Sequence, residues 1–165
     1  MKIQSRTLKL NFKSALAYMF ELYRRPMLIQ RFIVGTEVTI GMTGGTGNIM
    51  IFDPIEVKLL SSSVYGFEVK ENSSDQARYV RIDDSDLAAK IRSLSKTIFE
   101  GLGCRDAARI DYRVDPDGEI YFLEINPLPH LHPEIGDFCR SAAAAGRSYG
   151  DLLGLIMHSA NQRLN

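Results

Sequence analysis

Hydrophobic and polar residues alternate most regularly between Arg109 and Asn126. The stretch begins Arg-Ile-Asp-Tyr-Arg-Val and ends Glu-Ile-Tyr-Phe-Leu-Glu-Ile-Asn, with Asp-Pro-Asp-Gly between the two parts. Alternation rich in β-branched and aromatic residues predicts strands, and the Pro-Asp-Gly sequence favours a tight turn. The pattern therefore predicts a β-hairpin.

The two faces of this hairpin are predicted to differ in polarity. If Val114 lies opposite Glu119, odd positions of the first strand share a face with even positions of the second. One face then carries Arg109, Asp111, Glu124 and Asn126. The other face is expected to meet the core, and it carries Ile110, Tyr112, Val114, Leu123 and Ile125.

The polar face has the chemistry of a magnesium site. Carboxylate and amide oxygens are hard ligands, and Mg²⁺ in proteins takes one or two carboxylates together with water and substrate phosphate. A neighbouring guanidinium can hold a phosphate through its planar fork. The alternative is that the alternating charges only form a solvated face of the hairpin.

The remaining pattern predicts helices and strands throughout the chain. Apolar residues at helical spacing predict helices over 14–23, over 86–100, from Glu134 or Ile135 to 145, and from Ser148 to about 163. Asp84 or Ser85 is expected to cap the helix over 86–100. Strands are predicted over 27–33 (buried), 36–43, 49–52 and 54–58. Residues 1–13 are expected to form an edge strand or an irregular lead-in, and 71–78 a mobile loop acting as a lid.

The glycine-rich stretch 41–47 is predicted to be a hairpin turn. A phosphate loop would need a helix N-terminus after it, and an apolar strand follows instead.

Composition narrows the function classes. The chain has 165 residues, 45% of them hydrophobic, and zero net charge, which suits one domain with a sizeable core. Lys and Arg are scattered, so neither nucleic acid nor an anionic membrane is an expected partner. Without a transmembrane-length apolar run or a signal-peptide pattern, the expected location is cytoplasmic. Cys104 and Cys139 are then expected to be free, buried thiols.

Arg-Ile-Asp-Tyr followed by Leu-Glu-Ile-Asn-Pro resembles the metal-binding signature of ATP-grasp ligases, in particular the D-alanine:D-alanine ligase-like family. The resemblance implies an α+β fold, a mainly antiparallel sheet flanked by helices, as in the C-terminal ATP-grasp subdomain. It also implies that Asp111 binds one Mg²⁺, Glu124 bridges two, Asn126 completes the second, and Arg109 contacts the transferring phosphate.

The stretch 29–37 resembles the hinge that meets the nucleotide in that family. The resemblance implies adenine contacts at Gln30, where the family has glutamate, and at Ile33. Glu37 would accept hydrogen bonds from both ribose hydroxyls, although an exposed strand acid is the alternative. Lys70 is the candidate for the phosphates, with Lys58 as competitor and a solvated lysine as the alternative for both. Leu123 is a further nucleotide-contact candidate.

The loop after the signature departs from the family. His130 takes the place of a glycine, and no serine for the acceptor occurs between Asn126 and Ser141. His130 and His132 lack the further ligands of a zinc site and are predicted to be loop histidines. The acceptor pocket is therefore expected to differ.

The resemblance implies an ATP- and Mg²⁺-dependent carboxylate-amine ligase module that works through an acylphosphate on an amino acid or small peptide. Residues 1–35 would be the tail of the central ATP-grasp subdomain and 36–165 the C-terminal subdomain. The rest would belong to a longer ligase or a partner, or be lost in a relic, and a homodimer is also an option. The competing hypothesis is a truncated or degenerate module that binds nucleotide or a partner chain without catalysis.

Overall fold

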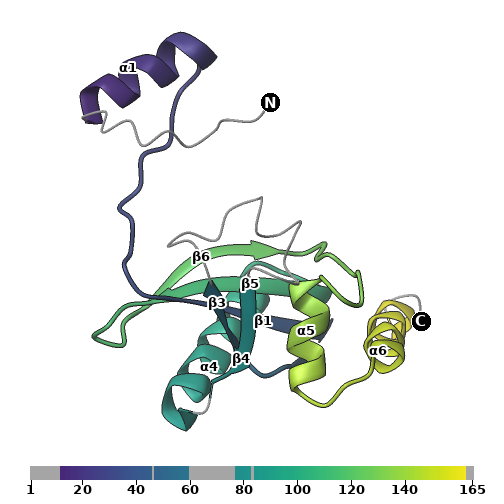
Figure 1. Cartoon of the computed structure of the whole chain (residues 1–165). Helices are drawn as coiled ribbons and strands as arrows, with labels where there is room; N and C mark the ends of the chain where they lie inside the picture. Colours follow the sequence, from purple (N-terminus) through teal and green to yellow (C-terminus); the bar gives the residue numbers. More distant parts are fainter. Residues whose placement is uncertain (1–11, 46, 60–76, 83, 163–165) are drawn as a thin grey trace. The chain divides into compact units, whose positions relative to one another are not determined.

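The chain was analysed as a computed structural model, which describes residues 12–45, 47–59, 77–82 and 84–162 (Figure 1). It divides into two compact units, residues 1–32 and 33–165. Residues 1–11 of the predicted lead-in, residues 71–76 of the predicted loop and Lys70 lie outside the described residues.

In the first unit, α1 (Phe12–Tyr23) confirms the predicted helix, and none of its residues is buried. The buried strand predicted at 27–33 is wrong. Residues 26–34 form neither helix nor strand, and Leu28 is 83% exposed. An apolar run becomes a strand only when another strand pairs with it, and the described sheet begins at Thr36.

The second unit is built on one antiparallel sheet with the order β4-β3-β1-β5-β6, and β2 pairs with the remaining part of β1. The strands are β1 (Thr36–Gly45), β2 (Asn48–Ile51), β3 (Ile55–Leu59), β4 (Ala77–Arg81), β5 (Asp106–Val114) and β6 (Ile120–Asn126). The helices are α4 (Ser85–Gly101), α5 (Asp137–Ala144) and α6 (Tyr149–Gln162). The predicted fold class is confirmed. The turn predicted at 41–47 is wrong for 41–45, because these residues continue β1 and pair with β2 and β5.

Strand β4 was not predicted. Its first two residues, Ala77 and Arg78, fall in the stretch expected to be a loop. The strand has five residues, two of them arginines, and it occupies the edge of the sheet. A short, charged edge strand has no buried alternation for a sequence pattern to detect.

Side-chain caps explain where two helices begin. The Asp84 carboxylate accepts hydrogen bonds from the backbone N–H groups of Asp86 and Leu87, which confirms Asp84 as the cap of α4. Before α6, Ser148 Oγ accepts from the Asp151 N–H, and the Asp151 carboxylate accepts from the Ser148 N–H. This reciprocal capping box also lowers the pKa of Asp151, through the hydrogen bonds from Ser148.

Helices cover the two faces of the sheet unequally. Helix α4 packs against the face of even-numbered residues in β1 and β5, and the core there comprises Val38, Ile40, Met42, Ile91, Phe99, Ala108, Ile110, Tyr112 and Val114. On the opposite face, α5 and α6 bring Phe138 and Leu152 over Phe52 and Ala107. At Gly41 this approach leaves no room for a Cβ, which would lie 2.8 Å from the rings of Phe138 and Phe52. The rest of this second face carries the polar side chains of β1 and β5, beside the buried Ile55 and Val57 of β3.

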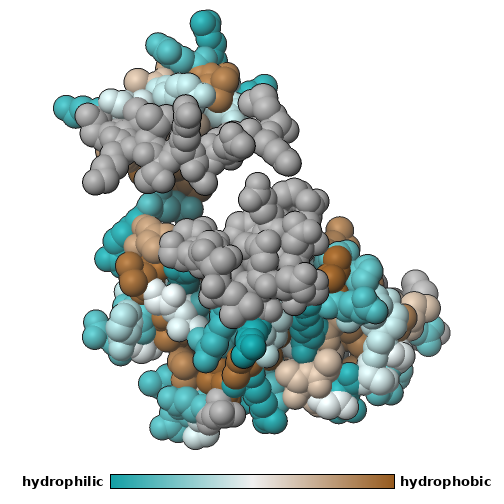
Figure 2. Space-filling view, viewed as in Figure 1, coloured by the Kyte–Doolittle hydropathy of each residue, from teal (hydrophilic) through white to brown (hydrophobic). Residues whose placement is uncertain are grey.

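The visible surface of the second unit mixes hydrophilic and hydrophobic residues (Figure 2). Its most exposed large apolar side chains are not gathered in one element, and they are Leu128, Met157, Val34 and Leu102. Among the described residues, no helix is long and apolar enough to cross a membrane.

Candidate magnesium and nucleotide site

The polar face is assembled from neighbouring strands β1 and β5. Ladder pairing sets Thr39 opposite Asp111 and Glu37 opposite Arg113, and Arg109 lies two positions before Asp111 on the same face. All three β5 residues are charged yet almost fully buried, with 6% of Arg109, 9% of Asp111 and 7% of Arg113 exposed. Buried charges are retained where they are paired or bind a ligand.

Strand β6 adds Glu124 and Asn126 through a register that differs from the predicted one. Val114 pairs with Ile120 rather than with Glu119. Continued unchanged, that pairing would set Glu124 opposite Ile110, on the core face. The ladder shifts between Asp111 and Tyr112, however, so that Glu124 lies opposite Asp111 and Asn126 opposite Arg109.

The shift is a β-bulge at Leu123, which has no partner in the ladder. One extra residue in a strand reverses the facing of everything beyond it. The predicted polar face is therefore correct for a reason the sequence pattern did not supply. The prediction that Leu123 faces the core is wrong, because the bulge leaves it 46% exposed.

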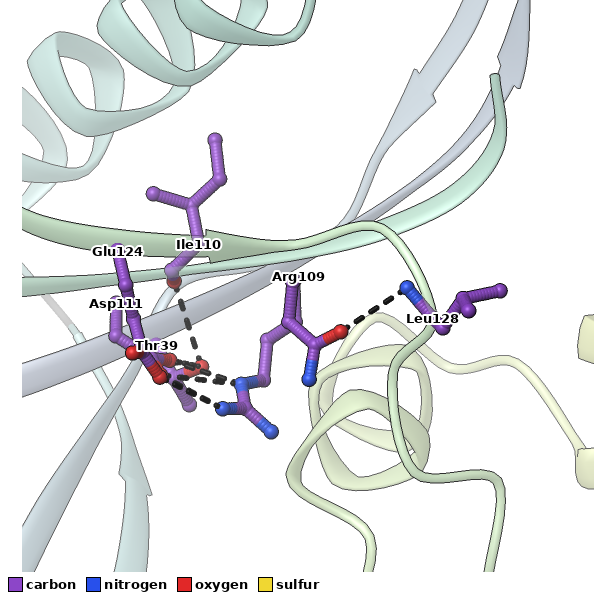
Figure 3. Close-up of polar contacts among 7 residues, drawn as sticks. Thr39, Arg109, Ile110, Asp111, Glu124 and Leu128 are labelled. Carbon is purple, nitrogen blue, oxygen red and sulfur yellow. Dashed lines mark hydrogen bonds and ion pairs between the residues drawn. The ribbon is translucent and has the colours of Figure 1, made fainter. Parts of the chain in front are cut away.

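Arg109 and Asp111 form the centre of the site (Figure 3). The guanidinium donates through Nε to Asp111 Oδ1 at 3.0 Å and through Nη2 to Oδ2 at 2.8 Å. The same Nη2 lies 3.7 Å from Glu124 Oε1. A positive charge thus lies between two carboxylates contributed by adjacent strands.

The surroundings of Arg109 favour its positively charged form. Burial of the guanidinium lowers the pKa of Arg109, but the adjacent Asp111 carboxylate, its hydrogen bonds and the more distant Asp137 and Glu124 raise it further, so the net direction is upward. The carboxylates at this position accordingly surround a permanent cation. This cation offsets part of the negative charge that Asp111 and Glu124 present, and a divalent cation would compete with it for their oxygens.

The donor set fits Mg²⁺. Asp111 and Glu124 supply carboxylate oxygens, and Asn126 Oδ1 accepts one hydrogen bond from the Leu128 N–H at 3.0 Å, which leaves a lone pair for a second partner. Two carboxylates and an amide oxygen match a cation that keeps several waters and takes further ligands from phosphate. In the described part of the chain, no three His, Cys, Asp or Glu residues converge on one point, so a closed site made only of such residues is not found there.

Arg113 joins two of the predicted nucleotide contacts. Its Nη1 donates to the Ile33 carbonyl at 2.8 Å, and its Nη2 lies 3.4 Å from Glu37 Oε2. The sequence analysis did not single out Arg113. The alternation of the strand could have identified Arg113, because a residue two positions after Asp111 lies on the same face of the sheet.

The predicted contacts at Gln30 and Lys70 stay predictions. Gln30 belongs to the first unit and is exposed. Glu56 pairs with Val38, so Lys58, two residues later, lies on the face opposite Asp111, where it forms an ion pair with Glu56 at 3.3 Å. This geometry disfavours Lys58 and leaves Lys70 as the candidate for the phosphates.

The loop after Asn126 folds tightly on itself. The Gly136 N–H donates to the His132 carbonyl at 2.9 Å, and a Cβ at Gly136 would lie 2.5 Å from the His130 carbonyl oxygen. The rings of His130 and His132 are exposed, with centroids 5.9 Å apart. His132 Nδ1 accepts a hydrogen bond from the Glu134 N–H at 3.2 Å.

Both cysteines are free, as predicted. Burial raises the pKa of the Cys104 thiol and that of the Cys139 thiol. Each is therefore protonated at neutral pH and is a poor nucleophile.

Comparison with known proteins gives a consistent result. Residues 3–158 match the family model described as D-ala D-ala ligase C-terminus. The chain is 31% identical over 139 residues to a D-alanine–D-alanine ligase of Fervidobacterium nodosum, covering 84% of this chain and 43% of the relative. It is 32% identical over 135 residues to the D-alanine–D-alanine ligase of Pelotomaculum thermopropionicum, covering 81% of this chain and 41% of the relative. The chain thus spans about two fifths of the length of these relatives.

Solved structures agree on the fold. The D-alanine–D-alanine ligase of Bacillus anthracis complexed with ATP matches with a TM-score of 0.72 at 24% identity, covering 91% of this chain and 47% of that chain. At this identity the match supports the ATP-grasp fold alone.

Proposed function

Because the chain belongs to the D-ala D-ala ligase C-terminus family, we propose that it is the magnesium- and nucleotide-binding C-terminal module of an ATP-dependent carboxylate-amine ligase. The observation that carries the proposal is the convergence of Arg109, Asp111, Glu124 and Asn126 on one face of the β5–β6 hairpin. The module would extend from about residue 36 to 165, with 1–35 as the tail of the central subdomain.

Each residue of the site has a role that its chemistry supports. Asp111, Glu124 and Asn126 would hold Mg²⁺, which offsets the charge of the phosphates when bound. Arg109 presents Nε and Nη2 to Asp111, so its Nη1 remains on the outer edge of the guanidinium, where a phosphoryl oxygen can be bound.

The nucleotide would be held from the hinge side. Glu37 would accept from the ribose hydroxyls while Arg113 fixes its carboxylate, and the main chain at Ile33 together with Gln30 would meet adenine. Lys70 would bind the phosphates, and Leu123, exposed at the bulge, would contact the base.

The proposed reaction has two steps. A substrate carboxylate oxygen attacks the γ-phosphorus of ATP, the bond to the ADP oxygen breaks, and an acylphosphate forms. An amine then attacks the acyl carbon, a C–N bond forms, phosphate leaves and the nitrogen loses a proton. The residues of this chain supply positioning and electrostatic stabilisation, and none is required as a covalent nucleophile.

The substrates would be small. D-alanine is the first candidate by analogy with the ligases matched above. The loop after Asn126, with His130 and His132, differs from the family pattern and makes another amino acid or a short peptide an alternative acceptor. The reaction would take place in the cytoplasm.

The test is acceptor-dependent release of phosphate from ATP. The protein is incubated with ATP, Mg²⁺ and individual amino acids, starting with D-alanine, and phosphate and the condensed product are both quantified. The proposal predicts equal amounts of the two. Glu124→Ala should abolish both, whereas Glu119→Ala, an exposed glutamate at the other end of the hairpin, should retain both.

A second candidate function requires no catalysis. In this alternative the chain, which spans about two fifths of the ligases, would bind nucleotide, a complementary polypeptide or a second copy of itself without catalysis. Binding of ADP with no phosphate release for any acceptor would favour this function.

A further inference from the structure

Thr39 is a buried polar residue at the centre of the site. It lies directly opposite Asp111 in the β1–β5 ladder and is 2% exposed. Its Oγ1 lies 2.6 Å from Asp111 Oδ1 and 3.4 Å from the Ile110 carbonyl oxygen. A hydroxyl has one proton to donate, and the shorter distance indicates that Thr39 donates it to Asp111. Figure 3 shows Thr39 beside the carboxylate that Arg109 also contacts.

Three donors share the Asp111 carboxylate. Thr39 Oγ1 bonds Oδ1, Arg109 Nη2 bonds Oδ2, and Arg109 Nε lies 3.0 Å from Oδ1 and 3.2 Å from Oδ2. A carboxylate offers about four lone-pair sites, so few remain for a metal ion. A cation that binds Asp111 would compete with the guanidinium for the same oxygens, since both carry positive charge.

The hydroxyl of Thr39 does not compete in this way. It is neutral, it bonds one oxygen, and its β-branched side chain has few rotamers in a buried strand. We propose that Thr39 is a positioning residue, which keeps the Asp111 carboxylate in a fixed orientation when Mg²⁺ binds beside the Arg109 contact. The proposal rests on the proposed function, because it assumes that Asp111 is a metal ligand.

Thr43 provides the matched comparison within the same strand. It lies four residues further along β1, on the same face, and is fully buried. Among the described residues its Oγ1 has no hydrogen-bond partner. Burial on this face therefore does not by itself give a threonine hydroxyl a hydrogen-bond partner, and the hydrogen bond from Thr39 to Asp111 is specific to that position.

The test is a Mn²⁺ titration of the full 165-residue chain in the presence of ADP, followed by the relaxation rate of water protons. Four proteins are compared: wild type, Thr39→Val, Thr39→Ser and Thr43→Val. Valine keeps the volume and removes the hydroxyl, and serine restores the hydroxyl. Thermal unfolding of each variant fixes a temperature at which all four are folded.

We expect Thr39→Val to weaken Mn²⁺ binding roughly 10-fold or more, the usual effect of removing a group that orients a metal ligand. Thr39→Ser should remain close to wild type, and so should Thr43→Val. Rescue by serine separates positioning from loss of packing, because serine is the smaller residue and fills the site less well.

Three results would overturn the proposal. Unchanged Mn²⁺ affinity in Thr39→Val refutes it while the proposed function stands. Equal weakening in Thr39→Val and Thr43→Val assigns the effect to general packing and refutes it as well. If wild type binds no Mn²⁺, the magnesium site itself is rejected and the role of Thr39 is rejected with it.

Discussion

The two faces of β5 bury their side chains equally well by different means. Ile110 and Tyr112 are fully buried against α4, and Arg109 and Asp111, the residues before each, are almost as buried on the other side. Burial of apolar area is favourable in itself. Burial of a charged pair yields little net stability, because the desolvation cost is of similar size to the attraction. The apolar face therefore contributes more to stability than the charged face, and the proposed function assigns the charged face to ligand binding.

Asp111→Ala should have the largest effect on stability. It leaves the buried guanidinium of Arg109 without its partner, and breaking a buried ion pair from one side costs about 3–5 kcal/mol. Urea unfolding measures the loss. The matched variant is Glu124→Ala, whose side chain is 60% exposed and should change the free energy of unfolding by no more than about 0.5 kcal/mol. Equal losses in the two variants would contradict the account.

Ile91→Ala tests the apolar face from the α4 side. Ile91 is fully buried in the core beneath β5, and truncation to alanine should cost about 2–5 kcal/mol in the same unfolding assay. Mn²⁺ affinity of the folded variant should equal that of wild type. Weakened metal binding here would show that the two faces are not functionally separate.

Alkaline pH should destabilise the apolar face through Tyr112. Burial raises the pKa of Tyr112 to about 12, and the hydrogen bond with Ser95 lowers it less. The folded-state pKa lies above the unfolded value near 10, so this stabilising contribution is complete below about pH 10. It is lost as the pH rises through 12, by about 3 kcal/mol for a shift of two units. Stability measured from pH 9 to 12 should fall less steeply in Tyr112→Phe than in wild type.

Tyr112→Phe should have the smallest effect at neutral pH. The Tyr112 hydroxyl lies 2.8 Å from Ser95 Oγ, and both groups are buried. Leaving Ser95 unpaired should cost about 1–2 kcal/mol. A double-mutant cycle with Ser95→Ala measures the coupling, and a coupling of zero would refute the pairing.

Local signals in the sequence predicted most of the second unit. The turn residues and alternation defined the β5–β6 hairpin, and Asp84 and Ser148 marked helix starts through side chains that bond the nearest N–H groups. These features depend on neighbours within a few residues. A pattern over such short distances is visible in one sequence.

Features that depend on distant partners could not be predicted in the same way. The bulge at Leu123 and the strand β4 are set by pairing across the sheet, and the apolar run at 27–33 forms no described strand. Thr39 of β1 and Arg113 of β5 join the site through hydrogen bonds between these two strands. The bonded residues are 71 or more positions apart in the sequence. Only the ladder register reveals these contacts.

The most direct test of the central claim is a calorimetric titration of ADP with and without Mg²⁺. It is performed on wild type, on Glu124→Ala, which removes an exposed ligand without removing a buried partner, and on Glu119→Ala as the control. We predict magnesium-dependent binding in wild type and Glu119→Ala, and its loss in Glu124→Ala. Binding that is independent of Mg²⁺, or that is unchanged in Glu124→Ala, would contradict the assignment of this face as the magnesium and nucleotide site.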